Sequence, residues 1–102
     1  MTRQEFQAVL EESFTIMRST LEIKRDEYAT TEDVLRNFKE SSRLAKKPAE
    51  QCLMGFVLKQ FVSLNDLIDA NRNEKTLMEE KIKDILNYMI LLRAILKDKE
   101  AS

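Results

Sequence analysis

Residues 48–69, PAEQCLMGFVLKQFVSLNDLID, decide the fold expected of this chain. Apolar side chains recur there at spacings of three and four residues, which is the period of an α-helix. A broad apolar arc follows this spacing: Cys52, Leu53, Phe56, Val57, Phe61, Leu64, Leu67 and Ile68. A second apolar set, on the opposite side, consists of Met54, Leu58 and Val62. A helix that is apolar on two sides is expected to be central in a bundle or shared with another subunit.

A polar run separates this helix from a further one, which is predicted over residues 76–97. Thr76 and Glu79 have the spacing of a capping box, which marks a helix N-terminus. The expected core face of this helix contains Met78, Ile82, Ile85, Leu86, Met89, Leu92 and Leu96. Leu91 and Ile95 fall on the otherwise polar side, so this helix also keeps apolar side chains for contact with another subunit.

Two more helices are predicted on the N-terminal side. The first covers residues 2–28, where one face collects Phe6, Leu10, Phe14, Met17, Leu21 and Tyr28. The second covers residues 31–45, follows an N-cap at Thr30 or Thr31, and ends before Pro48 because a proline disfavours helix at the residue that precedes it. Its inward side chains are expected to be Val34, Leu35, Phe38, Leu44 and Ala45.

The chain is therefore predicted to be one all-α domain over residues 1–102, folded as a small four-helix bundle. One glycine and one proline are too few for the many turns of a β-sandwich or a β-barrel. A chain of 102 residues buries a modest share of its surface when it folds alone. Together with the two-sided helices, this size predicts a homo-oligomer.

The composition excludes several classes of function. There is no histidine and a single cysteine, Cys52, which excludes Ser-His-Asp and Cys-His catalysis, an intramolecular disulfide, and histidine or multi-thiolate zinc sites. Lys and Arg number 17 against 18 Asp and Glu, so the basic excess of a protein that binds a DNA or RNA polymer is missing. No apolar run reaches the roughly 18 residues of a membrane span. The acidic, amphipathic N-terminus is no targeting signal, so a cytoplasmic location without membrane contact is expected.

Polar side chains follow helical spacing on two of the predicted helices. The two stripes are Glu80, Asp84 and Asn87, and Lys59, Ser63 and Asp66. Each stripe joins charge to hydrogen-bonding groups on one helix face, as a polar ligand requires, although a solvated helix face is the simpler explanation. A charge-dense run, residues 24–33, joins the first two helices. It contains Tyr28, which can stack on a base or fill the edge of a core.

Three stretches together resemble a family of small phage and prophage proteins: residues 24–38 (KRDEYATTEDVLRNF), 56–68 (FVLKQFVSLNDLI) and 80–92 (EKIKDILNYMILL). The family pattern reads DEYA…NF, then KH..S, then EK..D..NY. The family is related to the nucleotide-modification-associated domain and to the all-α MazG-like nucleotide pyrophosphohydrolases, so the resemblance implies a link to nucleotides. The matching positions are Lys24, Asp26, Tyr28, Asn37, Phe38, Lys59, Ser63, Glu80, Lys81, Asp84, Asn87 and Tyr88.

The sequence departs from this resemblance at the residues that would carry catalysis. Gln60 stands where the family pattern has histidine. MazG-like enzymes hold magnesium with an EExxE motif on one helix and an ExxD motif on another, and residues 48–69 contain no EExxE. Lys81 occupies the position three residues before Asp84, where the ExxD glutamate belongs. Magnesium-assisted hydrolysis needs several convergent carboxylates. Binding of a nucleotide without hydrolysis, and without a metal or another cofactor, is therefore expected.

The leading hypothesis is a non-catalytic, phage-type protein that binds a nucleotide or a cyclic oligonucleotide, for example to sequester a signal of host defence. The cations expected at the phosphates are Lys24, Arg25 and Lys59. Tyr28 or Tyr88 is expected to stack on a base. The side chains expected to hydrogen-bond base or ribose are Asn37, Ser63, Asp84 and Asn87. Lys59 and the segment 24–28 are expected to meet near Asp84 and Asn87.

Two alternatives belong to other classes. The first is a divergent MazG-like nucleotide pyrophosphohydrolase that uses Glu79, Glu80 and Asp84. The second is a helical protein–protein interaction module whose second apolar face binds another protein.

Overall fold

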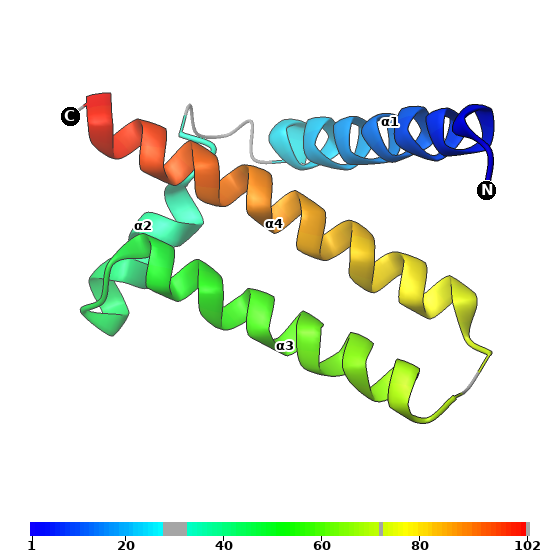
Figure 1. The fold of residues 1–102 in the computed structure, drawn as a ribbon. Helices are drawn as coiled ribbons and strands as arrows, with labels where there is room; N and C mark the ends of the chain where they lie inside the picture. The colour runs from blue at the N-terminus through cyan, green and yellow to red at the C-terminus, as the bar shows by residue number, and fades with distance from the viewer. Residues whose placement is uncertain (28–32, 72, 102) are drawn as a thin grey trace.

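The computed structural model describes residues 1–27, 33–71 and 73–101, and Figure 1 shows their arrangement. Over these residues the regular structure is helical throughout. The helices are α1 (Arg3–Glu27), α2 (Arg36–Ala45), α3 (Ala49–Asp69) and α4 (Lys75–Ala101). The predicted all-α class with four helices is confirmed.

The helices α3 and α4 form an antiparallel hairpin, and α4 is its inner helix because α1 lies along its other side (Figure 1). The short helix α2 packs against α3 near the end of the hairpin where α4 finishes. Helices α3, α4 and α1 therefore form one layer, which α2 backs at one end only. Domains are usually built from two packed layers around a core, so this arrangement leaves one side of the layer open.

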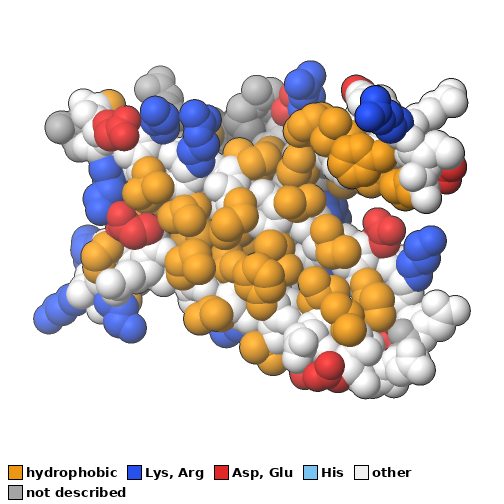
Figure 2. Space-filling view, in the orientation of Figure 1, with side chains coloured by type: hydrophobic (Ala, Val, Ile, Leu, Met, Phe, Trp, Pro, Cys, Tyr) orange, Lys and Arg blue, Asp and Glu red, His pale blue; other side chains and the backbone are white. Residues whose placement is uncertain are grey.

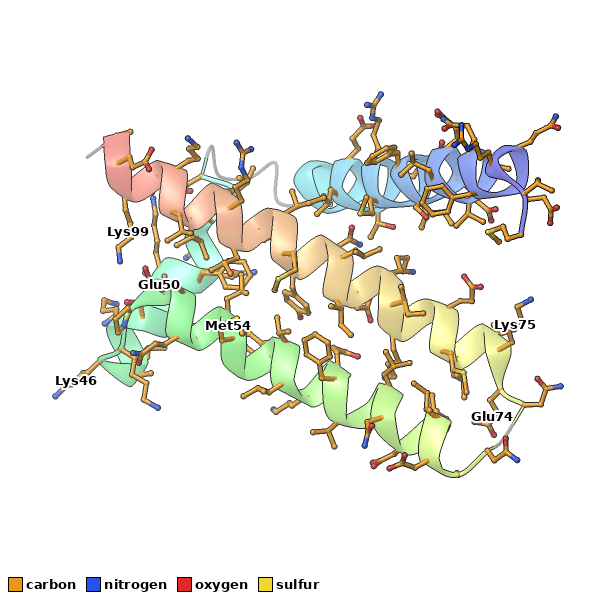
Figure 3. All side chains as sticks on the ribbon, viewed as in Figure 1. Lys46, Glu50, Met54, Glu74, Lys75 and Lys99 are labelled. Carbon is orange, nitrogen blue, oxygen red and sulfur yellow. The ribbon has the colours of Figure 1, made fainter. Side chains whose placement is uncertain are left out.

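The core is small and sits where α2, α3 and α4 meet. Its buried members are Leu35, Leu53, Val57 and Ile95, and Phe38, Tyr88 and Leu92 are among the half-buried side chains packed against them. Leu53 and Val57 from α3 meet α4 residues spaced three and four apart, which is the seam of a coiled-coil pair. An ion pair between Lys99 and Glu50, 2.5 Å from Nζ to Oε2, closes the seam beside the core (Figure 3).

The structure corrects the predicted core face of α4. Ile95, expected on the polar side, is only 4% exposed and belongs to the core. The side chains of Ile82, Leu86, Met89 and Leu96, expected inside, are between 37% and 47% exposed. The reason is that α4 carries two neighbouring apolar stripes, and helical spacing alone does not choose which of them packs on α3.

The same correction applies to the three other helices. Spacing identified apolar stripes correctly, but packing buries only part of each. The side chains expected inside that are largely exposed are Phe6 and Phe14 of α1, Val34 and Leu44 around α2, and Phe56, Phe61 and Ile68 of α3. Helices α1 and α2 each contact one other helix, and α3 contacts two. The other helices of the chain therefore cover only part of each broad apolar face.

The helix ends follow local chemistry, with differences from the predicted bounds. Thr2 and Glu5 form a capping box: the backbone N–H of Glu5 donates to Thr2 Oγ1 and the N–H of Thr2 donates to Glu5 Oε1, at 3.0 and 3.3 Å. The capping box predicted at Thr76 is wrong, because α4 begins at Lys75 and includes that residue. At its other end α4 continues to Ala101 rather than ending near residue 97.

The helix α2 begins at Arg36, later than the predicted residue 31. The predicted N-caps Thr30 and Thr31 lie outside the described residues. Asp33 turns the chain instead, since its carboxylate accepts the backbone N–H of Leu35 at 2.9 Å and so competes with helical bonding. The predicted stop is confirmed: α2 ends at Ala45, and Pro48 directly precedes α3.

Lys39 ties α2 to the end of α4. Its Nζ lies 2.6 Å from Asp33 and 3.1 Å from Asp98. The hydrogen bond from Lys39, with that from the N–H of Leu35, lowers the pKa of Asp33 below its ordinary 3.8, and the same pairing raises the pKa of Lys39. A lowered carboxyl pKa stabilises the fold above the ordinary pKa, and this stabilisation is lost as the pH falls through the lowered value.

We therefore expect Lys39→Met to reduce the drop in melting temperature that accompanies acidification from neutral pH to below 3.8. The difference in acid sensitivity between Lys39→Met and the parent will be small, because the side chains of Lys39, Asp33 and Asp98 are each about half exposed to solvent. Circular dichroism melts at the two pH values measure it. Lys47→Met is the matched control, since Lys47 is an exposed lysine without an ion pair in the described part of the chain. Equal acid sensitivity of both variants and the parent would contradict this assignment.

Candidate functional site

A broad apolar patch runs across α3 and α4 beneath α1 on the face of the molecule that Figure 2 shows. Its α3 side chains follow a heptad spacing of their own and are Met54, Leu58, Phe61 and Ile68. Its α4 side chains do the same and are Ile82, Leu86, Met89 and Leu96. We call these eight residues the open face. All of them are exposed, although their spacing is that of a packed seam.

Helical geometry places both halves of the open face on one side of the hairpin. At 100° per residue, the Met54–Phe61 stripe lies about a quarter turn from the buried Leu53 and Val57. On α4 the Ile82–Met89 stripe lies about a third of a turn, in the same sense, from the side that carries the core residues Tyr88, Leu92 and Ile95. Ile82 and Leu86 at its edge also line the cleft between α4 and α1. Because α3 and α4 run antiparallel, the two rotations bring both stripes to the same side. Met54 and Leu58, from the second apolar set predicted for α3, therefore lie on this side, about a quarter turn from the core rather than opposite it.

The surface area of the molecule is large for its mass. The solvent-accessible surface is 8018 Å², whereas a compact monomer of 12.0 kDa exposes about 6,000 Å². The radius of gyration is 15.9 Å, against roughly 13 Å for a compact domain of this length. The chain thus leaves about 2,000 Å² more surface in water than a compact fold would.

The predicted polar stripes lie on the side of the hairpin opposite the open face. Ser63 on α3 and Asp84 on α4 are both half-buried there. Lys59 is exposed and lies further round α3. Neither Lys59 nor Asp84 has an ion pair with any described residue. The structure therefore brings the two stripes to one side of one pair of helices, without a contact that would mark Lys59 as a ligand cation.

The other predicted ligand-binding residues divide into those that the structure describes and those it does not. Tyr28 lies outside the described residues, as do the side chains of Lys24 and Arg25 at the end of α1. Asn37 is exposed on α2. Tyr88 is half-buried, and its ring stacks on that of Phe56 with centroids 6.4 Å apart and planes 10° apart. Tyr88 thus helps join α4 to α3, and this packing explains it without a base.

Asn87 is the predicted site residue whose position most needs an explanation. It is 2% exposed, and among the described residues neither its side-chain oxygen nor its nitrogen has a hydrogen-bond partner. The side-chain oxygen of Gln60 on α3 is likewise buried without a partner in the described part of the chain. Buried amides are normally satisfied, and an unsatisfied one costs about 1–3 kcal/mol. Sequence reasoning selected Asn87 from its spacing with Asp84, but it expected an accessible side chain.

The carboxylates proposed for a divergent hydrolase do not form one group. Glu79 and Glu80 line a cleft of about 300 Å³ between α1 and α4, with Met17 and Leu86 among its apolar walls. Asp84 is not among the residues that line this cleft. Within residues 1–27, 33–71 and 73–101, no group of three His, Cys, Asp or Glu side chains could hold a metal ion.

The chain was compared with family models, curated proteins and solved structures, and no match was found in any of the three. The resemblance to small phage proteins therefore stays a prediction. Among the helices of the described residues, none combines the length and the apolar character needed to cross a membrane. The feature that the structure itself defines best is the open face.

Proposed function

We propose that this chain is a helical protein–protein interaction module whose open face binds another folded chain. The supporting observation is the open face itself: eight exposed apolar side chains at seam spacing on one side of a helical hairpin. Contiguous apolar patches larger than a few hundred Å² are rare on monomeric proteins and mark interaction sites. Covering such a patch stabilises by about 25 cal/mol for each Å² of apolar area removed from water.

A photoreactive side chain on the open face tests this proposal. Phe61 is 46% exposed and lies in the middle of the α3 half, so it is replaced with p-benzoylphenylalanine. The control is the same replacement at Leu44, which is 71% exposed but lies on α2, outside the open face. Irradiation of cells that make the chain is expected to yield a covalent protein adduct from position 61 and little or none from position 44.

The pattern of adducts decides the proposal. Adducts of equal yield from both positions would mean non-specific collision and would contradict it, as would the absence of adducts from position 61. Mass spectrometry of the adduct then identifies the chain that covers the open face.

The nucleotide-binding hypothesis is retained as a second candidate because of Asn87. Its side-chain amide is buried and has one acceptor and two donors without a partner among the described residues. A base or a ribose could form hydrogen bonds with these groups. The ligand in this candidate is a nucleotide or a cyclic oligonucleotide, bound on the side of the hairpin away from the open face. A phage origin, a cytoplasmic location and a role in sequestering a defence signal belong to this candidate and remain proposals.

A further inference from the structure

We propose that the chain bound by the open face is a second copy of this protein, so that two α3–α4 hairpins pack face to face into a four-helix bundle. This inference rests on the proposed function and names its partner. Each copy supplies the layer that the other lacks, because α3, α4 and α1 lie side by side and α2 backs only one end (Figure 1).

The area on offer matches what a stable dimer buries. Obligate homodimers bury about 2,000–5,000 Å² in total, which is about 1,000 Å² or more from each copy. The present chain exposes about 2,000 Å² beyond the surface of a compact monomer. If dimerisation covers about half of this excess surface on each copy, each copy buries the roughly 1,000 Å² that an obligate homodimer needs. The helices need not move for this to happen.

The side-chain spacing fits a helical hairpin better than a flat or loop-rich partner. Met54, Leu58 and Phe61 are four and three residues apart, as are Ile82, Leu86 and Met89. This is the pattern that inserts side chains of one helix between those of another. Two such stripes from antiparallel helices make a face that can pack against an identical face about a two-fold axis.

The charge distribution permits two copies to approach. The eight residues of the open face are uncharged; in register with them, α3 carries the polar Asn65 and α4 carries one cation, Arg93. The net charge of the whole chain is −1, so two copies experience little mutual repulsion. Glu50 and Lys99 form an ion pair at the end of the hairpin, and neither belongs to the open face (Figure 3).

The test is the mass of the particle formed by the purified full-length chain. Sedimentation equilibrium at micromolar concentration is expected to give twice the chain mass of 12.0 kDa. Phe61→Glu and, independently, Met89→Glu place a charge in the two halves of the open face and are expected to raise the dimer dissociation constant at least about 100-fold. Leu44→Glu makes the same kind of change, apolar to charged, at a 71% exposed position on α2 outside the open face, and is expected to leave the constant within about threefold.

Far-ultraviolet circular dichroism accompanies each variant, since a helical monomer must be distinguished from an unfolded chain. Where Phe61→Glu lowers helicity, the purified chain with p-benzoylphenylalanine at position 61 decides instead. Its adduct is expected to join position 61 to a peptide from α3 or α4 of the second copy. An adduct that joins it to any other helix overturns the inference.

A parent chain that sediments at 12.0 kDa overturns the inference, as does a dimer that is indifferent to both glutamate variants. These failures are separate from failure of the proposed function. A monomeric chain that still gives a position-61 adduct with a different protein in cells keeps the interaction module and loses only the second copy as its partner.

Discussion

Leu53→Ala is expected to lower the free energy of unfolding by about 2–5 kcal/mol. Leu53 is 0% exposed and belongs to the buried cluster with Leu35, Val57 and Ile95, which joins α2, α3 and α4. The alanine loses the transfer free energy of the buried side chain and leaves a cavity that the surrounding helices fill only partly. Because the core has few members, one truncation removes a large share of its apolar contacts.

Urea denaturation followed by circular dichroism measures this loss. All variants are compared at one protein concentration, because a bound second copy adds to the apparent stability. Leu44→Ala is the matched control: the side chain is 71% exposed on α2, and its truncation is expected to change stability by less than about 0.5 kcal/mol. A loss from Leu53→Ala no greater than that from Leu44→Ala would place the core elsewhere.

Asn87→Leu is expected to have the opposite sign and to raise the free energy of unfolding by about 1–3 kcal/mol. The amide at this position is buried, and neither of its polar atoms has a partner among the residues that the structure describes, so leucine of similar volume removes a desolvation cost and adds apolar contact. Asn37→Leu is the control, since Asn37 is exposed on α2 and its exchange changes little. A destabilised Asn87→Leu variant would contradict the assignment of an unpartnered amide.

The same variant separates the two candidate functions. If Asn87 binds a nucleotide, the purified parent releases a small molecule on heating and the Asn87→Leu protein does not. Mass spectrometry of the heated supernatant reads this directly. If Asn87 has no ligand, neither protein releases a nucleotide, and Asn87→Leu raises the melting temperature without affecting the adduct formed at position 61.

The candidate site was predictable only in part. Spacing predicts a second apolar side on residues 48–69, and its members Met54 and Leu58 belong to the open face. Phe61 and Ile68, which complete the α3 half of that face, were predicted to lie in the other apolar arc. Its partner stripe on α4 was assigned to the core, because Ile82, Leu86 and Met89 follow helical spacing as regularly as buried residues do. The burial of Asn87 was not predictable from the sequence. A polar residue one turn after Asp84 is expected to be exposed, and only the positions of the neighbouring helices show that it is buried.

The sequence by itself determined the helices of this protein and most of their ends. Apolar spacing, the turn at Asp33 and the stop before Pro48 act within a few residues, so they operate before any tertiary contact exists. Only the tertiary structure decided which apolar stripe is buried. Ile95 and Leu96 are equally apolar, and burial depends on where α2 and α3 lie, which are distant in sequence. Because the hairpin is only partly covered within one chain, one stripe of each helix packs inside and the other remains open to a partner.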